Sequence, residues 1–249
     1  MKEPRAARSS GSESQDERPT PGNRLLDALP RGEFERLRPH LEGLPIAARQ
    51  VLSEADGPIP HVYFPTGGVI SLVSFMEHGA AVEIATIGRE GLVGLPVFLG
   101  AESMPQRAFG QVPGHAYRIA ADVFRAEVRA GGALGPLLGR YTQAMFVQVA
   151  QTAACNRVHP VERRCARWLL QTHDRVGQAS YMLTQDFLAQ MLGVRRASVN
   201  AAAMGMQKAG LIGYVRGRIR ILDRGGLEAA SCACYGIIQR EFDRLLGHQ

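Results

Sequence analysis

The chain has 249 residues, of which 45% are hydrophobic, and a formal net charge of +6 at pH 7. This length is typical of two domains, and the apolar content is sufficient for their cores. No run of about 18 apolar residues occurs, so neither a membrane span nor a membrane partner is predicted. The polar N-terminus does not have the pattern of a signal peptide. These features together predict a cytoplasmic protein.

The positive charge is concentrated in one part of the chain. Residues 160–222 carry ten basic and three acidic side chains, a net of +7, so the rest of the chain sums to −1. A basic segment beside a nearly neutral remainder is the electrostatic pattern of a nucleic-acid-binding domain.

The first half of the chain changes from a polar tail to a β-rich domain. Residues 1–22 are rich in Ser, Gly, Pro, Glu and Arg without apolar periodicity, which predicts a disordered tail. Residues 23–133 are predicted to form one domain, with helical signals at 23–42 and near 90–99. Between 44 and 119, short apolar runs alternate with Gly and Pro turns, which predicts a β-roll or β-barrel. The expected strands are Ile46–Leu52, His61–Phe64, Val69–Phe75, Ala81–Ile87, Ala108–Val112 and Ala116–Ile119.

Residues 134–158 are predicted to form a long helix. Seven positions follow gaps of four and three: Leu134, Leu138, Tyr141, Met145, Gln148, Thr152 and Cys155. This spacing is typical of a coiled-coil seam and predicts a dimerisation helix, although a helix packed on its own domain is the alternative. His159-Pro160 ends the helix, because a residue before proline disfavours the α conformation. A second helix is expected over Pro160–Val176.

The stretch TQDFLAQMLGVRRASVNAAAMGMQKAGLI, residues 184–212, has the pattern of a helix-turn-helix. Thr184 suits a helix N-cap, and Gly193 can adopt the positive φ that a sharp turn requires. Ala189 and Val199 are small or apolar where two crossing helices would meet. The following residues 211–222, LIGYVRGRIRIL, alternate apolar and basic side chains, which predicts a two-stranded wing. We therefore predict a winged helix-turn-helix over 159–249, closed by a C-terminal helix.

The donors on the outer face of this unit match DNA chemistry, since Arg binds phosphate and guanine edges and Asn or Gln binds adenine. The predicted DNA-binding residues are Thr184, Gln185, Arg195, Arg196, Ser198, Val199, Asn200, Lys208, Arg216 and Arg218.

No other motif in the chain predicts catalysis or metal binding. The four cysteines are Cys155, Cys165, Cys232 and Cys234, and the C-x-C pair lacks a second ligand pair at metal-site spacing. Buried thiols in a reducing compartment are the simpler interpretation, and a redox role for the C-x-C pair stays open. No nucleophile motif, phosphate loop or paired carboxylates occur, so the chain is not predicted to be an enzyme.

The order of β-roll, long helix, Pro-containing hinge and winged helix, with the recognition sequence LGVRRASV, resembles the Crp/Fnr family of bacterial transcription regulators. The resemblance covers about residues 23–246. It implies an α+β fold: an N-terminal, jelly-roll-like β-roll sensor domain, a long dimerisation helix and a C-terminal winged helix-turn-helix.

The recognition helix departs from the pattern that the family commonly shows. Arg196 matches the first arginine of that pattern, whereas Ala197 stands where the family has Glu and Ala201 where it has a second Arg. The resemblance therefore implies an Arg196–guanine contact but a different operator.

The resemblance also bears on the effector. In cyclic-nucleotide-binding members, Gly-Glu precedes a short helix and Arg with Ser or Thr follows it. Here Glu90 precedes a Gly, and Gln106 then Arg107 stand in the later position. These three residues are the ligand-site candidates, but solvated charges or a surface ion pair are the more common role, and cyclic AMP is not the expected ligand.

Two other effector types found in such regulators have little support. An N-terminal iron–sulfur cluster is not expected because no Cys precedes Cys155. A haem ligand among His61, His78 and His115 stays open, although surface or turn positions are their usual role. The cofactor is thus left unknown.

The functional prediction is a homodimer that binds a palindromic double-stranded DNA operator and regulates transcription, with RNA polymerase as a further candidate partner. The alternative is a ligand-binding or protein-docking module whose winged helix does not bind DNA.

Overall fold

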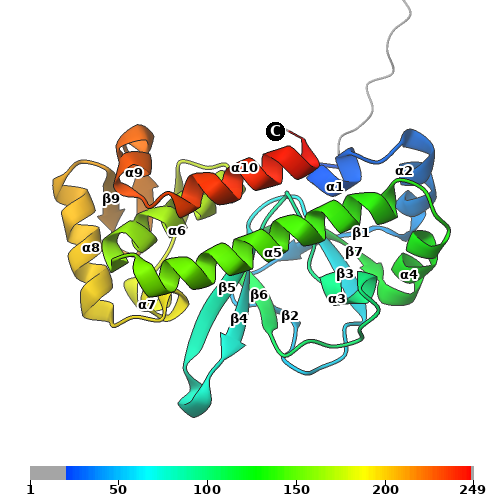
Figure 1. Cartoon of the computed structure of the whole chain (residues 1–249), viewed down its shortest axis with the longest axis horizontal. Helices are drawn as coiled ribbons and strands as arrows, with labels where there is room; N and C mark the ends of the chain where they lie inside the picture. Colours follow the sequence, from blue (N-terminus) through cyan, green and yellow to red (C-terminus); the bar gives the residue numbers. More distant parts are fainter. Residues whose placement is uncertain (1–20, 248–249) are drawn as a thin grey trace, which may run out of the picture.

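The computed structural model describes residues 21–247, so the predicted tail at 1–22 lies almost wholly outside the described part. None of the helices within that range is long and apolar enough to cross a membrane. The structure is a mixed helix and sheet fold with an N-terminal β-rich domain, a long helix and a C-terminal winged helix (Figure 1). The predicted α+β architecture is therefore confirmed.

Two antiparallel sheets form the β-roll. One has the order β1-β7-β3, from Glu42–Ile46, Gly114–Ala120 and His61–Pro65. The other has the order β2-β6-β4-β5, from Val51–Ser53, Arg107–Val112, Val69–Phe75 and Ala81–Ile87. The prediction of one strand over Ile46–Leu52 was wrong. The chain turns between β1 and β2, where Arg49 has a left-handed φ of 63°.

Short helices precede, connect and follow the strands of the roll. They are α1 (Arg24–Asp27), α2 (Arg31–Leu37), η1 (Arg38–His40), η2 (Glu77–Gly79), α3 (Leu95–Phe98) and α4 (Ala121–Arg129). Asn23 is fully buried and fixes the start of α1. Its oxygen accepts from Leu25 N and Leu26 N, and its amide donates to the carbonyls of Pro65 and Gly91.

Helix α5 (Leu134–Val158) has the predicted bounds, but its predicted coiled-coil seam is not a free surface. All seven seam residues, from Leu134 to Cys155, are buried within the chain itself. The alternative of a helix packed on its own domain is therefore correct for that face. A second 4-3 series, offset by one residue, is more open to solvent. Gly139, Phe146 and Ala153 are exposed, and Thr142 and Val149 between them are half-buried. Phe146 is 68% exposed, so an apolar stripe remains available on α5.

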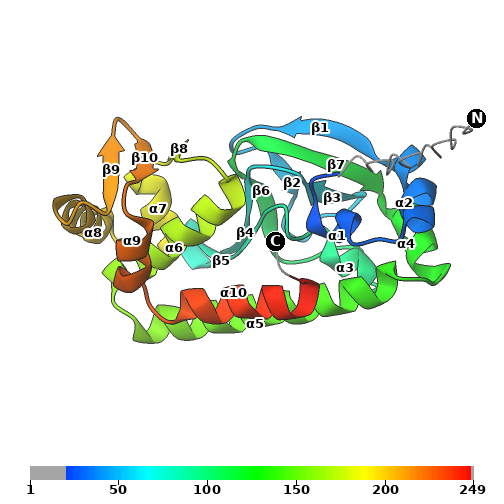
Figure 2. The same cartoon turned by 90° about the horizontal axis from the view of Figure 1, so that it is seen from above.

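The last helix, α10 (Cys234–Leu246), lies alongside α5 (Figure 2). Its Ile238 and Phe242 enter the core of the roll, and the Phe242 ring meets Tyr141 of α5 edge-on at 6.4 Å between centroids. By packing, α10 thus joins the β-roll and the long helix, although the sequence prediction grouped it with the winged helix in 159–249.

The winged helix consists of α6 (Val161–Val176), α7 (Gln185–Leu192), α8 (Arg196–Lys208), α9 (Arg224–Ala230) and a small sheet. The sheet has the order β8-β10-β9, from Ser180–Met182, Arg218–Ile221 and Ile212–Val215. Its core is continuous with one face of the roll, because Val69 and Val73 of β4 pack with Leu169 and Leu170 of α6. The two domains therefore share a hydrophobic interface in this conformation.

Candidate nucleic-acid interface

Local sequence explains the geometry of the helix-turn-helix. The Thr184 hydroxyl accepts a hydrogen bond from Phe187 N at 3.2 Å and so caps α7, as predicted. Gly193 ends α7 with a φ of 63°, and a Cβ there would also meet Val82 of β5 at 3.1 Å. A residue other than glycine would therefore be strained at this turn, which fixes how α8 leaves α7.

Val199 lies on the inner side of α8 with 0% exposure, packed in the core of the winged helix. Its side chain cannot reach DNA, so its inclusion among the DNA-binding residues was wrong. The outer side of α8 is formed by Arg196, Ala197, Asn200, Ala201 and Met204.

Two side-chain contacts link the outer side of α8 to the start of α7. Arg196 forms an ion pair with Asp186 at 3.3 Å, and Gln185 Nε2 donates to Asn200 Oδ1 at 3.2 Å. The structure thus brings Gln185, Arg196 and Asn200 together at one exposed edge. The sequence did not point to Asp186, or to Met204, which is 60% exposed on the same helix.

The wing places further arginines on the surface. Arg216 and Gly217 form its two-residue turn with φ values of 49° and 75°, the conformation of a type I′ hairpin. Arg216, Arg218 and Arg220 are all exposed, and Lys208 is exposed at the end of α8.

Three of the ten basic residues in 160–222 do not contribute to this surface. Arg164, Arg167 and Arg175 are at most 7% exposed on α6. Arg175 forms a buried ion pair with Glu90 of the roll at 2.8 Å and also donates to Gln148 of α5 at 3.0 Å. Part of the charge that the sequence assigned to DNA binding therefore holds the two domains together.

The three ligand-site candidates lie in three different environments. Glu90 is buried against Arg175, whereas Arg107 forms an exposed ion pair with Glu54 at 2.7 Å. Gln106 lines an apolar cavity of about 290 Å³ between α3 and α5, together with Leu95, Met145 and Phe146. Gln106 precedes β6 and Arg107 begins it, and the two side chains line different cavities. The structure therefore does not bring them into one site.

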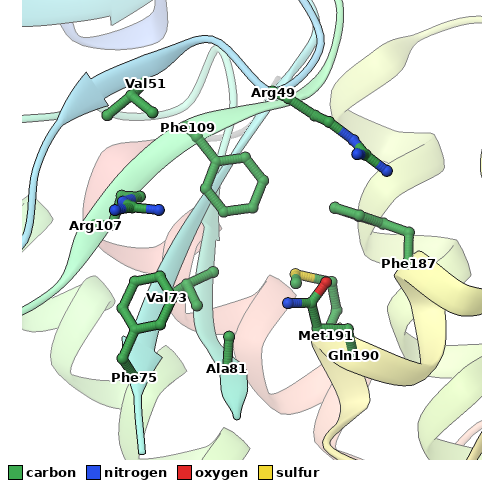
Figure 3. Close-up of a pocket in the computed structure, with 10 residues that line it drawn as sticks. All are labelled: Arg49, Val51, Val73, Phe75, Ala81, Arg107, Phe109, Phe187, Gln190 and Met191. Carbon is green, nitrogen blue, oxygen red and sulfur yellow. The ribbon is translucent and has the colours of Figure 1, made fainter. Parts of the chain in front are cut away.

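A second cavity, of about 280 Å³, opens where the roll meets α7 (Figure 3). The rings of Phe75 and Phe109 from the roll and of Phe187 from α7 border it, with Arg49 and Arg107 at its edges. The Phe109 and Phe187 rings meet edge-on at 6.2 Å between centroids, so this cavity lies directly beside the first helix of the helix-turn-helix.

A buried polar chain also crosses the domain interface. Trp168 Nε1 of α6 donates to Glu83 Oε1 of β5 at 2.6 Å, and Ser71 Oγ lies 2.6 Å from Glu83 Oε2 and 2.9 Å from Gln111 Oε1. Burial raises the pKa of Glu83 to about 7, against the smaller opposing effect of the Ser71 and Trp168 hydrogen bonds. One serine hydrogen can serve only one acceptor, so a proton on Glu83 completes the chain.

All four cysteines are buried free thiols, as predicted. Cys165 lies alone in the core of the winged helix, whereas Cys155, Cys232 and Cys234 converge with His159. Their ligand atoms all lie within 4.8 Å of one another. This group was not predicted from the sequence. The signal for it was a C-x3-H spacing at the end of the long helix, which supplies the second ligand pair.

Comparison with known proteins agrees with this architecture. Residues 163–230 match the model of a Crp-like helix-turn-helix domain. No curated protein sequence matches the chain.

Among solved structures, FixK2 from Bradyrhizobium japonicum is similar with a TM-score of 0.67 and 15% identity, over 78% of this chain and 98% of that one. A putative crp/fnr-family transcriptional regulator from Eubacterium rectale has a TM-score of 0.65 and 15% identity, over 83% and 96%. The c-di-GMP-responsive regulator CLP from Xanthomonas campestris has a TM-score of 0.60 and 14% identity, over 76% and 98%. These TM-scores show a shared fold.

Proposed function

We propose that the chain is a regulator of the Crp/Fnr type that binds operator DNA as a homodimer and regulates transcription. Support comes from the match of residues 163–230 to a Crp-like helix-turn-helix domain and from the fold that the chain shares with Crp/Fnr regulators. The observation that carries the proposal is the exposed edge formed by Arg196, Asn200 and Gln185, flanked by the arginines of the wing.

Each part of this edge suits one component of DNA. Arg196 and Asn200 on α8 have the donors and acceptors for guanine and adenine edges in a major groove. Ala197, Ala201 and Met204 offer methyl groups of the kind that contact thymine. The exposed Arg216 and Arg218 of the wing suit phosphates, which add affinity and fix register without reading sequence. Arg195, Ser198 and Lys208 belong to the same proposed surface, and Thr184 contributes mainly as the cap of α7.

The homodimer is proposed to form through helix α5. The second 4-3 series of this helix has heptad spacing, and its exposed members are the ring of Phe146 and two small residues that permit close helix approach. The series consists of Gly139, Thr142, Phe146, Val149 and Ala153. A two-fold axis along this stripe would present two recognition helices to a palindrome, with half-sites about one helical turn, roughly 34 Å, apart. Signal-dependent repositioning about His159-Pro160 remains part of the proposal.

Cyclic AMP is not proposed as the effector. Glu90 is buried in its pair with Arg175, and Arg107 borders a different cavity, so the two side chains do not form one site for a ribose and a cyclic phosphate. The cavity between α3 and α5 has almost no polar lining that could solvate a phosphate.

The test is affinity selection of fragmented genomic DNA by the purified protein at one fixed salt concentration, with and without cyclic AMP. The proposal expects the same two-fold symmetric motif in both samples. A motif that requires cyclic AMP would refute the effector assignment. Enrichment of no motif would favour the alternative of a docking module, for which Arg196→Ala should leave function intact.

A further inference from the structure

Four side chains able to bind a metal meet at the junction between the long helix and the end of the winged helix. Cys155 lies in the last turn of α5, and His159 is the residue that follows the helix. Cys232 and Cys234 lie between α9 and the start of α10. The fold thus joins a C-x3-H pair to a C-x-C pair from 77 positions away.

The spacing of the ligand atoms suits one small ion. Cys155 Sγ lies 3.5 Å from Cys232 Sγ, and Cys234 Sγ lies 3.5 Å from His159 Nδ1. A tetrahedral zinc site, with Zn–S of about 2.3 Å and Zn–N of about 2.0 Å, has edges of roughly 3.5–3.8 Å. The widest separation in the group, 4.8 Å, exceeds that edge by only about 1 Å, a change within the reach of side-chain rotation.

The surroundings also suit a metal–thiolate centre. All three cysteines are buried, and His159 is half-buried. Gln151 Nε2 already donates to Cys234 Sγ at 3.1 Å, the kind of outer contact that orients a metal ligand.

Two buried arginines provide charge compensation. Three thiolates, one histidine and a divalent cation carry a net charge of −1. The guanidinium groups of Arg164 and Arg167 both interact electrostatically with Cys155 and Cys232. Their Nε atoms are buried and have no hydrogen-bond partner within the described residues.

We propose that Cys155, His159, Cys232 and Cys234 bind a single zinc-type divalent cation in a closed tetrahedral Cys3His site. The site would fasten the end of α5 and the His159-Pro160 hinge to the start of α10. With no open coordination position, its role is structural, and it would stabilise the packing of α10 along α5. The inference does not depend on the proposed DNA binding.

The experiment begins with the full-length wild-type protein, purified under reducing conditions without added metal, and measures its metal content. We expect about one zinc per chain, as for a closed structural site. The metal-free wild-type protein is then titrated with Co²⁺, whose absorption spectrum reports tetrahedral thiolate coordination. This second measurement requires no variant to fold.

The variants are Cys155→Ser, Cys234→Ser and His159→Ala, with Cys165→Ala as the matched control because its thiol is buried outside the group. Each ligand variant should weaken Co²⁺ binding by at least about tenfold, whereas the control should bind as the wild type does. Zinc should also raise the melting temperature of the wild type more than that of the ligand variants.

Three results would overturn the inference. One is a folded, reduced wild-type protein that binds neither zinc nor Co²⁺. Another is binding that survives in all three ligand variants. The third is iron with acid-labile sulfide in place of zinc, which would indicate a cluster. Failure of DNA binding in a zinc-loaded protein would count against the proposed function alone.

Discussion

Arg196 is the side chain on which base discrimination depends most in the proposed interface. Arg196→Ala should reduce the preference for the selected motif over random DNA by about 1–3 kcal/mol, the usual worth of a bidentate arginine–guanine pair. The measurement is competitive binding of motif and random duplexes at several salt concentrations.

Substitutions in the wing should affect DNA binding differently from Arg196→Ala. Arg216→Ala or Arg218→Ala should weaken binding to both duplexes equally and flatten the slope of log K against log salt, since phosphate contacts release counterions whatever the sequence. Equal effects of all three substitutions on both duplexes would contradict the assignment of base contact to α8 and phosphate contact to the wing.

Glu83 makes a separate prediction at the residue scale, because its pKa rises from 4.5 to about 7 in the fold. The folded state then binds a proton more tightly than the unfolded state between about pH 4.5 and 7. Stability is greatest below this window and declines as pH rises through it.

Glu83→Gln keeps the shape and the acceptor for Trp168 without a buried charge. It should therefore flatten this pH dependence and stabilise the protein above pH 7, by on the order of 3 kcal/mol. Urea denaturation of both proteins at pH 5 and pH 8 measures the difference. If the stability of the wild type rises from pH 5 to pH 8, and the variant shows the same rise, Glu83 does not hold a buried proton.

At the scale of elements, the Glu90–Arg175 pair fastens α6 to the roll. Glu90→Gln leaves the buried Arg175 without its carboxylate, and removing one partner of a buried pair typically costs about 3–5 kcal/mol. The expected result is a large fall in the urea midpoint. Glu54→Gln is the matched control, because its pair with Arg107 is exposed and should contribute no more than about 1 kcal/mol. Similar effects of the two substitutions would show that the buried pair does not fasten the domains.

Helix α5 shows what could and could not be predicted from the sequence. The helix bounds and the apolar 4-3 series were both predicted correctly, because both are local patterns. Periodicity cannot show whether a face is buried by its own chain or by another. Only the structure shows that Tyr141 and Met145 are buried within the chain, while Phe146, one position after Met145, is exposed.

The same limit explains the other differences between sequence and structure. Arg164, Arg167 and Arg175 add to the net charge wherever they lie, so only the fold shows that they are buried. The turn at Gly193 and the wing turn at Gly217 were predictable because the conformations they need are local. The contact between Cys155 and Cys232 could not be predicted in this way, because the two residues lie 77 positions apart in the sequence.

The exposed stripe of α5 also gives a prediction. Phe146→Asp should convert the dimer into a monomer in sedimentation measurements, because it places a charge at the centre of the proposed helix pair. Leu222→Asp, at a position 56% exposed on the winged helix, is the control and should stay dimeric. A dimer unaffected by the change at Phe146 would place the subunit contact elsewhere.

At the scale of the whole molecule, the proposed two-fold symmetry of the dimer should match the two-fold symmetry of its operator. When two recognition helices are joined through α5, the second half-site is bound at a high effective concentration. The wild type should therefore bind the full palindrome about 10²–10⁴-fold more tightly than an isolated half-site. The monomeric Phe146→Asp variant should lose that advantage but keep the half-site affinity, because its α8 and wing are intact. Fluorescence anisotropy measures the affinity of the wild type and of the variant for the full palindrome and for an isolated half-site. If the wild type binds the half-site as tightly as the palindrome, a monomer reads the DNA, and the exposed stripe of α5 serves some other contact.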